Sequence, residues 1–336
     1  MYNKFLTIAI PTYNRSIKLT EMLNDILICL QSSPFKNNIK LFISNNGSED
    51  QTYDTLNFFS EKFQSINVNF KYDNLETNKG FDFNVFHCYS NSDSDYVWFI
   101  SDDDKLYKDN FDKIIEHVFI NESFIYYFNF SQGEVNITNP YIKNNITYSL
   151  EDKDYINSIS KILYCPKLTS VIIKKIDIKY FYNPHKYMNY GFMHLYLILE
   201  IVKFKGNITF SKIFVATTSI DYLDSIRFPP YITNYYLDFI KLYTIENNLQ
   251  HLFLDFSLGY IKCDPLSTNI LYLGSYLRGN FIIDKNLYIQ LKKEIRYDLI
   301  NYKLNRKNHI EVFTAILKYL FSLIIYIIKK TIKTTK

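Results

Sequence analysis

Up to about residue 130, short apolar runs alternate with longer segments in which apolar residues recur at helical spacing. The short runs predict four strands, at Leu6–Ile10, Ile39–Ile43, Val68–Tyr72 and Tyr96–Ile100, and Pro11 is expected to end the first. Helical spacing is clearest for Leu19, Met22, Leu23, Ile26, Leu27 and Leu30. This alternation predicts an α/β fold in which helices flank a mostly parallel sheet.

The pattern changes beyond residue 130. Residues 131–150 are rich in Asn, Thr and Ser, which predicts a surface excursion and a boundary. Farther on, the apolar spacing predicts helices at Tyr155–Leu163 and Phe192–Phe204, the second starting at Gly191, and a strand at Ser170–Ile173. We therefore expect four parts: two halves of one α/β domain at 1–130 and 131–230, a mainly helical region at 231–308 and a terminal helix at 309–336.

Composition and charge exclude some classes of protein. The chain has 336 residues, of which 47% are hydrophobic and 21% are charged, as in folded globular proteins. Its net charge is +4, and from Lys303 onward it has eight Lys or Arg and one acid, Glu311. The rest of the chain has no basic stripe and no standard nucleic-acid motif, so we expect no nucleic-acid partner. The four cysteines are scattered without a CxxC pair, which argues against zinc or redox chemistry.

The N-terminus bears on location. Residues 1–4 lead directly into the first predicted strand, without the apolar core and cleavage site of a signal peptide. We therefore expect the active part of the protein to face the cytoplasm.

A polar loop follows each predicted strand. In an open parallel sheet, such loops meet at the carboxyl edge, where ligands bind. Asp102, Asp103 and Asp104 follow a buried strand and would repel one another unless a cation compensates them. Hard divalent cations take such oxygen ligands and share them with phosphates, although Asp also caps helices and forms turns. Gly47 and Gly80 lie in two of the other loops and fit either an ordinary turn or a close approach to a ligand.

Together these loops resemble those of family 2 glycosyltransferases. The matching segments are, in order, Ile8–Arg15, Asn46–Thr52, Asn78–Gly80 with Asn84 downstream, and Tyr96–Asp104. The resemblance covers about residues 4 to 120 and depends on the set of motifs and its spacing. More loosely, the whole chain is similar to bacterial members that add sugars to O-antigen or capsule precursors, including abequosyltransferase-like members.

The resemblance implies a GT-A fold and metal-dependent transfer of a sugar from a nucleoside-diphosphate sugar. It implies that Thr12 and the loop at Asn45 hold the base and ribose, that Lys79 lies nearby, and that Asp102 approaches the ribose or diphosphate. Asp104, with Asp102, would bind Mn²⁺ or Mg²⁺. The donor-binding residues implied in this way are Pro11, Thr12, Tyr13, Arg15, Asn45, Asn46, Lys79, Gly80, Asn84, Asp102 and Asp103.

One donor-site residue departs from the family pattern. Many members carry Asp where this chain has Asn45. An ionised Asp only accepts hydrogen bonds, whereas Asn also donates them. The identity of the nucleotide base is therefore left open.

The transfer also requires a general base for the acceptor hydroxyl. The resemblance implies an acidic residue near the start of a helix, but the matching segment offers His194. Histidine has a suitable unperturbed pKa, yet a lone His on an apolar helix is also a common core residue. Asp221 and Asp224, followed by Arg227, form a second candidate cluster or a solvated loop. Inversion at the anomeric carbon is implied by the resemblance alone.

The C-terminal segment has the pattern of an amphipathic helix. Val312–Ile328 is apolar except at three positions, and is short of the ~20 residues of a spanning helix. With Lys329 and Lys333, those positions form one polar stripe, which predicts an in-plane helix on anionic lipid. The enzyme would then meet a lipid-linked saccharide at the inner face of the bacterial membrane. Packing on the protein, or on a second subunit of a homo-oligomer, is the alternative.

Three other classes are possible for an α/β chain of this kind. A nucleotidyltransferase usually has a Gly-rich phosphate loop after the first strand, but Ile10–Arg15 contains no glycine. A dinucleotide-dependent oxidoreductase is disfavoured because no GxGxxG follows a strand. A non-catalytic, membrane-associated scaffold with the same fold stays open, because Asn45 and the missing carboxylate base depart from the family pattern.

Overall fold

The computed structural model describes residues 3–132, 142–164 and 167–218, and all of 239–247 except 241 and 245. The chain divides into two compact units, and most of the described residues belong to the first, Met1–Ser158 with Pro166–Ile226. The expected helix at 309–336 and most of the expected helical region at 231–308 lie outside the described residues. No helix among those that are described is long and apolar enough to cross a membrane.

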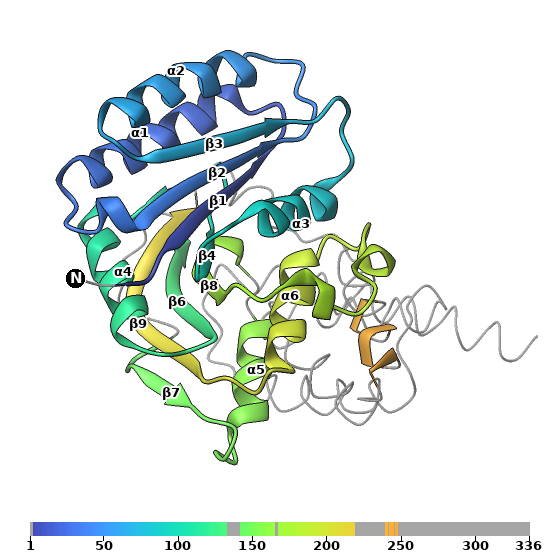
Figure 1. Cartoon of the computed structure of the whole chain (residues 1–336). Coiled ribbons are helices and arrows are strands. Elements are labelled where there is room, and N and C mark those ends of the chain that lie inside the picture. The colour runs from blue at the N-terminus through green and yellow to red at the C-terminus, as the bar shows by residue number, and fades with distance from the viewer. Residues whose placement is uncertain are drawn as a thin grey trace, which may run out of the picture. The chain divides into compact units, whose positions relative to one another are not determined.

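Strands and helices alternate through the first half of the chain (Figure 1). These elements are β1 (Leu6–Thr12), α1 (Ser16–Ser32), η1 (Lys36–Asn38), β2 (Ile39–Asn45), α2 (Thr52–Ser65), β3 (Asn69–Asn74), α3 (Phe81–Asn91), β4 (Tyr96–Phe99), β5 (Asp104–Leu106), η2 (Lys108–Asn110) and α4 (Phe111–Ile120). The later elements are β6 (Ile125–Gln132), β7 (Ile146–Tyr148), α5 (Tyr155–Tyr164), η3 (Leu168–Ser170), β8 (Val171–Lys174), η4 (Ile178–Tyr180), η5 (Pro184–Tyr187), α6 (Met193–Val202) and β9 (Ile208–Thr218).

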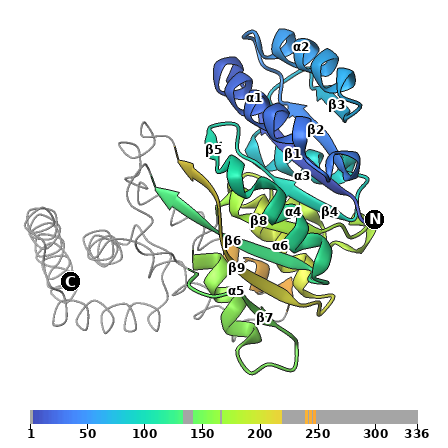
Figure 2. The ribbon, with the colours of Figure 1, turned by 90° about the vertical axis from the view of Figure 1, so that its left-hand side faces the viewer.

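The strands form one mixed sheet in the order β3-β2-β1-β4-β8-β6-β9-β5, with β7 also paired to β9. The predicted parallel arrangement holds for β3, β2, β1 and β4. Beyond β4 the sheet continues through antiparallel β8, and β6 and β9 lie side by side in parallel (Figure 2). An α/β fold with flanking helices is thus confirmed, and its parallel region is the half that carries the polar loops.

Apolar side chains of β1 show how the helices cover the sheet. Leu6, Ile8 and Ile10 are fully buried in one core with the apolar residues of α1, α2 and α4. Helix α3 packs against β1 and β2 and contacts α6, on the other face of the sheet (Figure 1). The site edge is thus supported by α1 on one face and by α3 with α6 on the other.

The prediction that Pro11 ends the first strand is wrong, because β1 continues to Thr12. Proline removes a backbone N–H, so it fits a strand only where that N–H needs no partner. The carbonyl of Ala9 accepts from the N–H of Ile100, so Ala9 faces β4, and the β1–β4 pairing stops at Ala9. Pro11 faces the same side, beyond the end of that pairing, while β2 still pairs with it through Ser44.

Two further expectations need correction. The predicted helix starting at Gly191 begins instead at Met193 and ends at Val202. Gly191 has φ +80°, which is outside the helical region. The excursion expected at residues 131–150 includes β7, a short strand paired with β9, while 133–141 lie outside the described residues.

Candidate active site

The loops after β1 and β4 meet at the carboxyl edge, as the sequence predicts. The Thr12 hydroxyl donates to Asp102 Oδ2 at 2.7 Å. Arg15 Nη1 donates to Asp102 Oδ1 at 2.7 Å and lies 2.8 Å from Asp103 Oδ2. These contacts fix the first two acidic side chains against the start of α1.

Arg15 changes the electrostatics expected of three adjacent acids. Burial raises the pKa of Asp102, while the Arg15 guanidinium and the Thr12 hydroxyl oppose that shift. Burial also opposes the charge on Arg15, yet Asp102 and Asp103 together raise its pKa. An internal cation is therefore shared by two of the three carboxylates and offsets one of their two charges.

Asp104 has different neighbours. Its Oδ2 accepts a hydrogen bond from the Thr169 hydroxyl, which in turn accepts from the N–H of Ser101 at 3.0 Å. Burial raises the pKa of Asp104 to about 7; Thr169 opposes the shift, and Asp103 adds to it. None of the ion pairs found in the described part of the chain includes Asp104. Lys167 also opposes the shift, so Asp104 is the one acid of the three that has no ion pair among the described residues but is still influenced by a nearby cation.

The acidic residues fit a shared metal site better than a closed one. Within the ranges that the structure describes, no group of three or more His, Cys, Asp or Glu side chains could hold a metal by itself. Both oxygens of Asp102 already accept hydrogen bonds, whereas Asp104 accepts one from Thr169. Mg²⁺ is often bound by one or two carboxylates together with substrate phosphates. Asp104, with Asp102 beside it, fits that arrangement.

Asn46 connects the loop after β2 to the loop after β3. Its backbone N–H donates to the carbonyl of Thr12 at 3.0 Å. Its side-chain amide donates to Asn78 Oδ1 at 2.8 Å and to the carbonyl of Gly80 at 3.1 Å, and accepts from the N–H of Lys79 at 2.9 Å. A single buried side chain thus shapes the loop 78–80.

Asn45, where many family members have Asp, also makes its side-chain hydrogen bonds within the protein. Its Nδ2 donates to Asn74 Oδ1 at 2.8 Å, and its Oδ1 accepts from the N–H of Ser48 at 3.2 Å. The donor capacity that distinguishes Asn from Asp is therefore used to hold Asn74, at the end of β3.

The other predicted donor residues surround the same edge. Pro11 is buried in β1, whereas Tyr13 is 39% exposed. Asn84, on α3, donates to the carbonyl of Thr12 at 3.2 Å. The Lys79 ammonium lies 4.9 Å from the ring centre of Phe83. All eleven predicted donor residues therefore belong to the four loops at this edge or to the elements next to them.

Gly47 lies where the loops after β2 and β3 pack most closely. It has φ +71°, and a Cβ there would lie 2.5 Å from the carbonyl carbon of Thr77. We expect Gly47→Ala to displace the loop 78–80 and to lower the melting temperature, because positive-φ strain of ~1–3 kcal/mol adds to the overlap with Thr77. The affinity for nucleoside diphosphates should fall as well, because the displaced loop carries Lys79 and Gly80. Thermal unfolding and calorimetric titration measure the two effects.

Gly191→Ala is the control for backbone strain. Gly191 has φ +80° but no atom within 4 Å of a built Cβ, so its variant lacks the overlap. The difference in melting temperature between the two variants measures the clash at Gly47. Equal melting temperatures would contradict the close packing of these loops.

His194 is the second residue of α6 and is 8% exposed. Its ring centre lies 6.4 Å from that of Phe81 and 6.3 Å from that of Phe192. Because Phe81 follows Gly80, the structure brings His194 close to the end of the loop 78–80. Asp221 and Asp224 lie outside the described residues.

Two residues of this region were missed in the sequence. Thr169, which binds Asp104, is a small polar residue before β8 and gives no distinctive signal. Asp82 is buried on α3, and its carboxylate accepts from the N–H groups of Gly191 and Met193. Asp82 does have a signal, since it shares the buried face of α3 with Val85 and Tyr89 at helical spacing.

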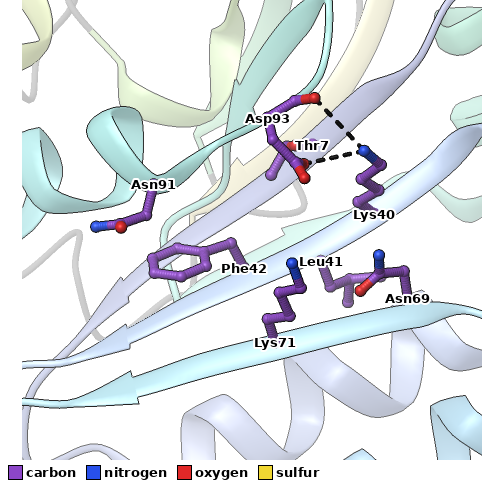
Figure 3. A pocket seen from close by; sticks show the side chains of 8 residues that line it. All are labelled: Thr7, Lys40, Leu41, Phe42, Asn69, Lys71, Asn91 and Asp93. Carbon is purple, nitrogen blue, oxygen red and sulfur yellow. Dashed lines mark hydrogen bonds and ion pairs between the residues drawn. The ribbon is translucent and has the colours of Figure 1, made fainter.

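A small hollow at the opposite end of the strands has no such features (Figure 3). Thr7, Lys40, Lys71 and Asp93 are among the residues that line it. Lys40 Nζ lies 3.0 Å from Asp93 Oδ1, so these two charges compensate each other. The carboxyl edge is the better candidate for an active site.

The mixed sheet and the acidic loop at its carboxyl edge define a GT-A fold. The chain belongs to glycosyl transferase family 2, which it matches over residues 7–188. Over 105 residues it is 32% identical to abequosyltransferase RfbV of Salmonella typhimurium. The aligned residues make up 31% of this chain and 30% of that relative. The family and fold expected from the sequence are thereby confirmed.

Solved structures share the fold. S. aureus TarS 1–349 in complex with UDP has a TM-score of 0.53 at 16% identity and covers 99% of this chain and 92% of that one. Mannosyltransferase PcManGT from Pyrobaculum calidifontis, in complex with GDP-Man and Mn²⁺, has a TM-score of 0.52 at 10% identity. The match covers 96% of this chain and 88% of the mannosyltransferase chain. Another structure of TarS is matched over 49% of its chain. At these identities the likeness shows the fold alone.

Proposed function

We propose that this protein transfers a sugar from a nucleoside-diphosphate sugar to a hydroxyl of a saccharide, with inversion, in bacterial surface polysaccharide assembly. The observation that carries the proposal is the poorly compensated carboxylate of Asp104 beside Asp102, which is tied to the loop after β1. Family membership supports the reaction class. The partial likeness to an abequosyltransferase supports a deoxyhexose or hexose as the sugar.

The donor would lie across the carboxyl edge. Thr12 and the loop at Asn45 and Asn46 would hold the base and ribose, with Lys79 nearby. The internal hydrogen bonds of Asn45 and Asn46 support this assignment, because they hold the loops rigid before a ligand arrives. A preformed site binds at a lower cost in conformational entropy.

Asp104, together with Asp102, would bind Mn²⁺ or Mg²⁺. Such a cation acts as a Lewis acid for the charge that develops on the leaving diphosphate. Arg15 holds Asp102 in place, and Thr169 orients Asp104. These contacts orient the two carboxylates, and neither of them places a cation in an ion pair with Asp104.

The acceptor hydroxyl must lose a proton as it attacks the anomeric carbon. His194 is our candidate for the base, because it lies beside Phe81 at the end of the donor loop. An imidazole nitrogen would take the proton of that hydroxyl, and the sugar–phosphate bond would break on the opposite face of the anomeric carbon. Asp221 and Asp224 are the alternatives for this role.

A lipid-linked acceptor is supported by the amphipathic pattern of residues 309–336. Such a helix would place the enzyme on the inner face of the bacterial cytoplasmic membrane. Cosedimentation with anionic vesicles, for the full chain and for a chain ending before residue 309, tests this point. Equal sedimentation of the two would favour packing of the helix on the protein or on a second copy.

A scaffold that binds without catalysis is the second candidate. It is favoured by His194 in place of a carboxylate base and by the ion pairs of Arg15 with Asp102 and Asp103, which partly neutralise these two acids. Metal-dependent hydrolysis of a nucleoside-diphosphate sugar would exclude it.

Calorimetric titration with UDP, CDP, GDP and dTDP, each with Mn²⁺ and with EDTA, tests the proposed donor site. We expect one nucleotide to bind in a metal-dependent way, which would also narrow the choice of sugar. No binding of any of the four, by protein with a cooperative thermal transition, would contradict the proposal.

A further inference from the structure

A buried acid on α3 binds the beginning of α6. Asp82 is the second residue of α3 and is 3% exposed. Its Oδ2 accepts from the N–H of Gly191 at 2.7 Å, and its Oδ1 accepts from the N–H of Met193 at 2.9 Å. Both oxygens of one carboxylate are therefore directed at the segment that enters α6.

Helix α6 needs this contact because it has no cap of its own. The N-cap position is Phe192, whose side chain has no hydrogen-bond acceptor. The first N–H groups of a helix have no partner within the helix, and a negative charge there also interacts well with the helix dipole. Asp82 supplies both the acceptor and the charge from another helix.

The approach to α6 also has an unusual backbone. Asn189 has φ +75° and Gly191 has φ +80°. A backbone that enters the left-handed region twice in three residues is held by its surroundings more than by local preference. The carboxylate of Asp82, bound on both sides of Phe192, fixes this turn.

Asp82 also lies at the end of the loop that Asn46 shapes. Asn46 binds the N–H of Lys79 and the carbonyl of Gly80, and Asp82 follows two residues later. On the other side of Asp82, Met193 is followed by His194. Two sets of hydrogen bonds, joined by the short stretch of chain from Gly80 to Asp82, thus link the end of β2 to the first turn of α6.

We propose that Asp82 is a positioning residue that fixes the first turn of α6, and with it His194, against the donor loop 78–80. The inference rests on the proposed transfer reaction with His194 as its base. Aspartate suits the role because both of its oxygens accept. An Asn in its place would have to direct an NH₂ group at one of the two backbone N–H groups.

The test compares Asp82→Asn with Glu200→Gln. Glu200 is the matched control: it is a buried acid farther along α6, 1% exposed, and its Oε2 accepts from the N–H of Tyr182 at 3.0 Å. Hydrogen exchange of peptides covering residues 189–195 reports directly whether the Asp82 carboxylate holds the backbone at Gly191 and Met193. Calorimetric titration reports the nucleoside diphosphate site, and steady-state kinetics report kcat and the KM for donor.

We expect Asp82→Asn to speed exchange at residues 189–195 and to lower kcat by about 10- to 100-fold, as a misplacement of ~1 Å can. Nucleotide affinity and the KM for donor should stay within about 2-fold of wild type, because the hydrogen bonds that hold the loop 78–80 are made by Asn46 and not by Asp82. Glu200→Gln should change neither exchange at 189–195 nor kcat. Should Asp82→Asn not fold, Asp82→Glu, which keeps the charge but displaces it, should show the same split.

Unchanged exchange at residues 189–195 in Asp82→Asn would contradict the inference that Asp82 fixes the first turn of α6. Faster exchange with wild-type kcat, or equal losses in kcat and in nucleotide affinity, would overturn the positioning role. A wild-type protein that neither binds a nucleoside diphosphate nor transfers sugar would overturn the proposed function, and this role with it. The nucleotide titration of the wild type separates that outcome from the others.

Discussion

We expect Asp104→Asn to abolish measurable sugar transfer while the protein stays folded. Asn keeps an oxygen that accepts from the Thr169 hydroxyl but loses the negative charge. Removing one group that stabilises the charge of a transition state typically lowers kcat by about 10²–10³-fold. A transfer assay with Mn²⁺ across a range of donor concentrations measures the loss. Asp93→Asn, at the far end of the sheet, is the control and should retain wild-type kcat.

Thermal unfolding completes this test. Folding raises the pKa of Asp104, which means that its anion is less favourable in the folded than in the unfolded state. Above the pKa of the unfolded state, the charge of Asp104 therefore lowers the free energy of unfolding. Replacing Asp104 by a neutral amide should therefore leave the melting temperature at pH 8 equal to or above that of the wild type. Full activity of Asp104→Asn, with metal still required, would contradict the assignment of the site.

His194→Gln should have the other large effect on turnover. Loss of a general base lowers kcat by about 10²–10⁴-fold. Donor affinity should not change, because the loop contacts made by Asn46 and Thr12 do not involve His194. Steady-state kinetics combined with nucleotide titration separate the two quantities.

His185→Gln is the matched control for this variant. His185 lies in η5, and its ring centre lies 6.4 Å from that of Phe86 on α3. It should retain wild-type kcat. Near-wild-type turnover by His194→Gln would instead direct the search for the base to Asp221 and Asp224.

The sequence predicts the site half of the fold well, for a physical reason. Parallel strands buried on both faces are continuous apolar runs, and the polar loops after them are conspicuous. An apolar run such as Ser170–Ile173 does not show in which direction its strand pairs, so the antiparallel partner of β4 could not be predicted. The prediction for Pro11 failed for a similar reason. A strand tolerates proline where no neighbouring strand needs its N–H, and the sequence does not show where the neighbouring strand ends.

The candidate site shows the same limit. Three adjacent acids predict a divalent cation, which stays a prediction, and the sequence cannot show that Arg15 already supplies one positive charge to two of them. Arg15 and Asp102 are 87 residues apart, and only the fold brings them together. The contact between Asp82 and the backbone at Gly191 is hidden in the same way, because N–H groups have no sequence signature.

The partial neutralisation by Arg15 implies reciprocity between ligands. With Arg15 counted against Asp102, Asp103 and Asp104, the edge keeps an excess of negative charge, which repels a diphosphate. A cation and a nucleotide should each raise the affinity for the other by the same factor. In the proposed reaction, donor occupancy at low concentrations of free metal would then follow the product of the two concentrations, so the divalent ion would limit the rate although it is not consumed.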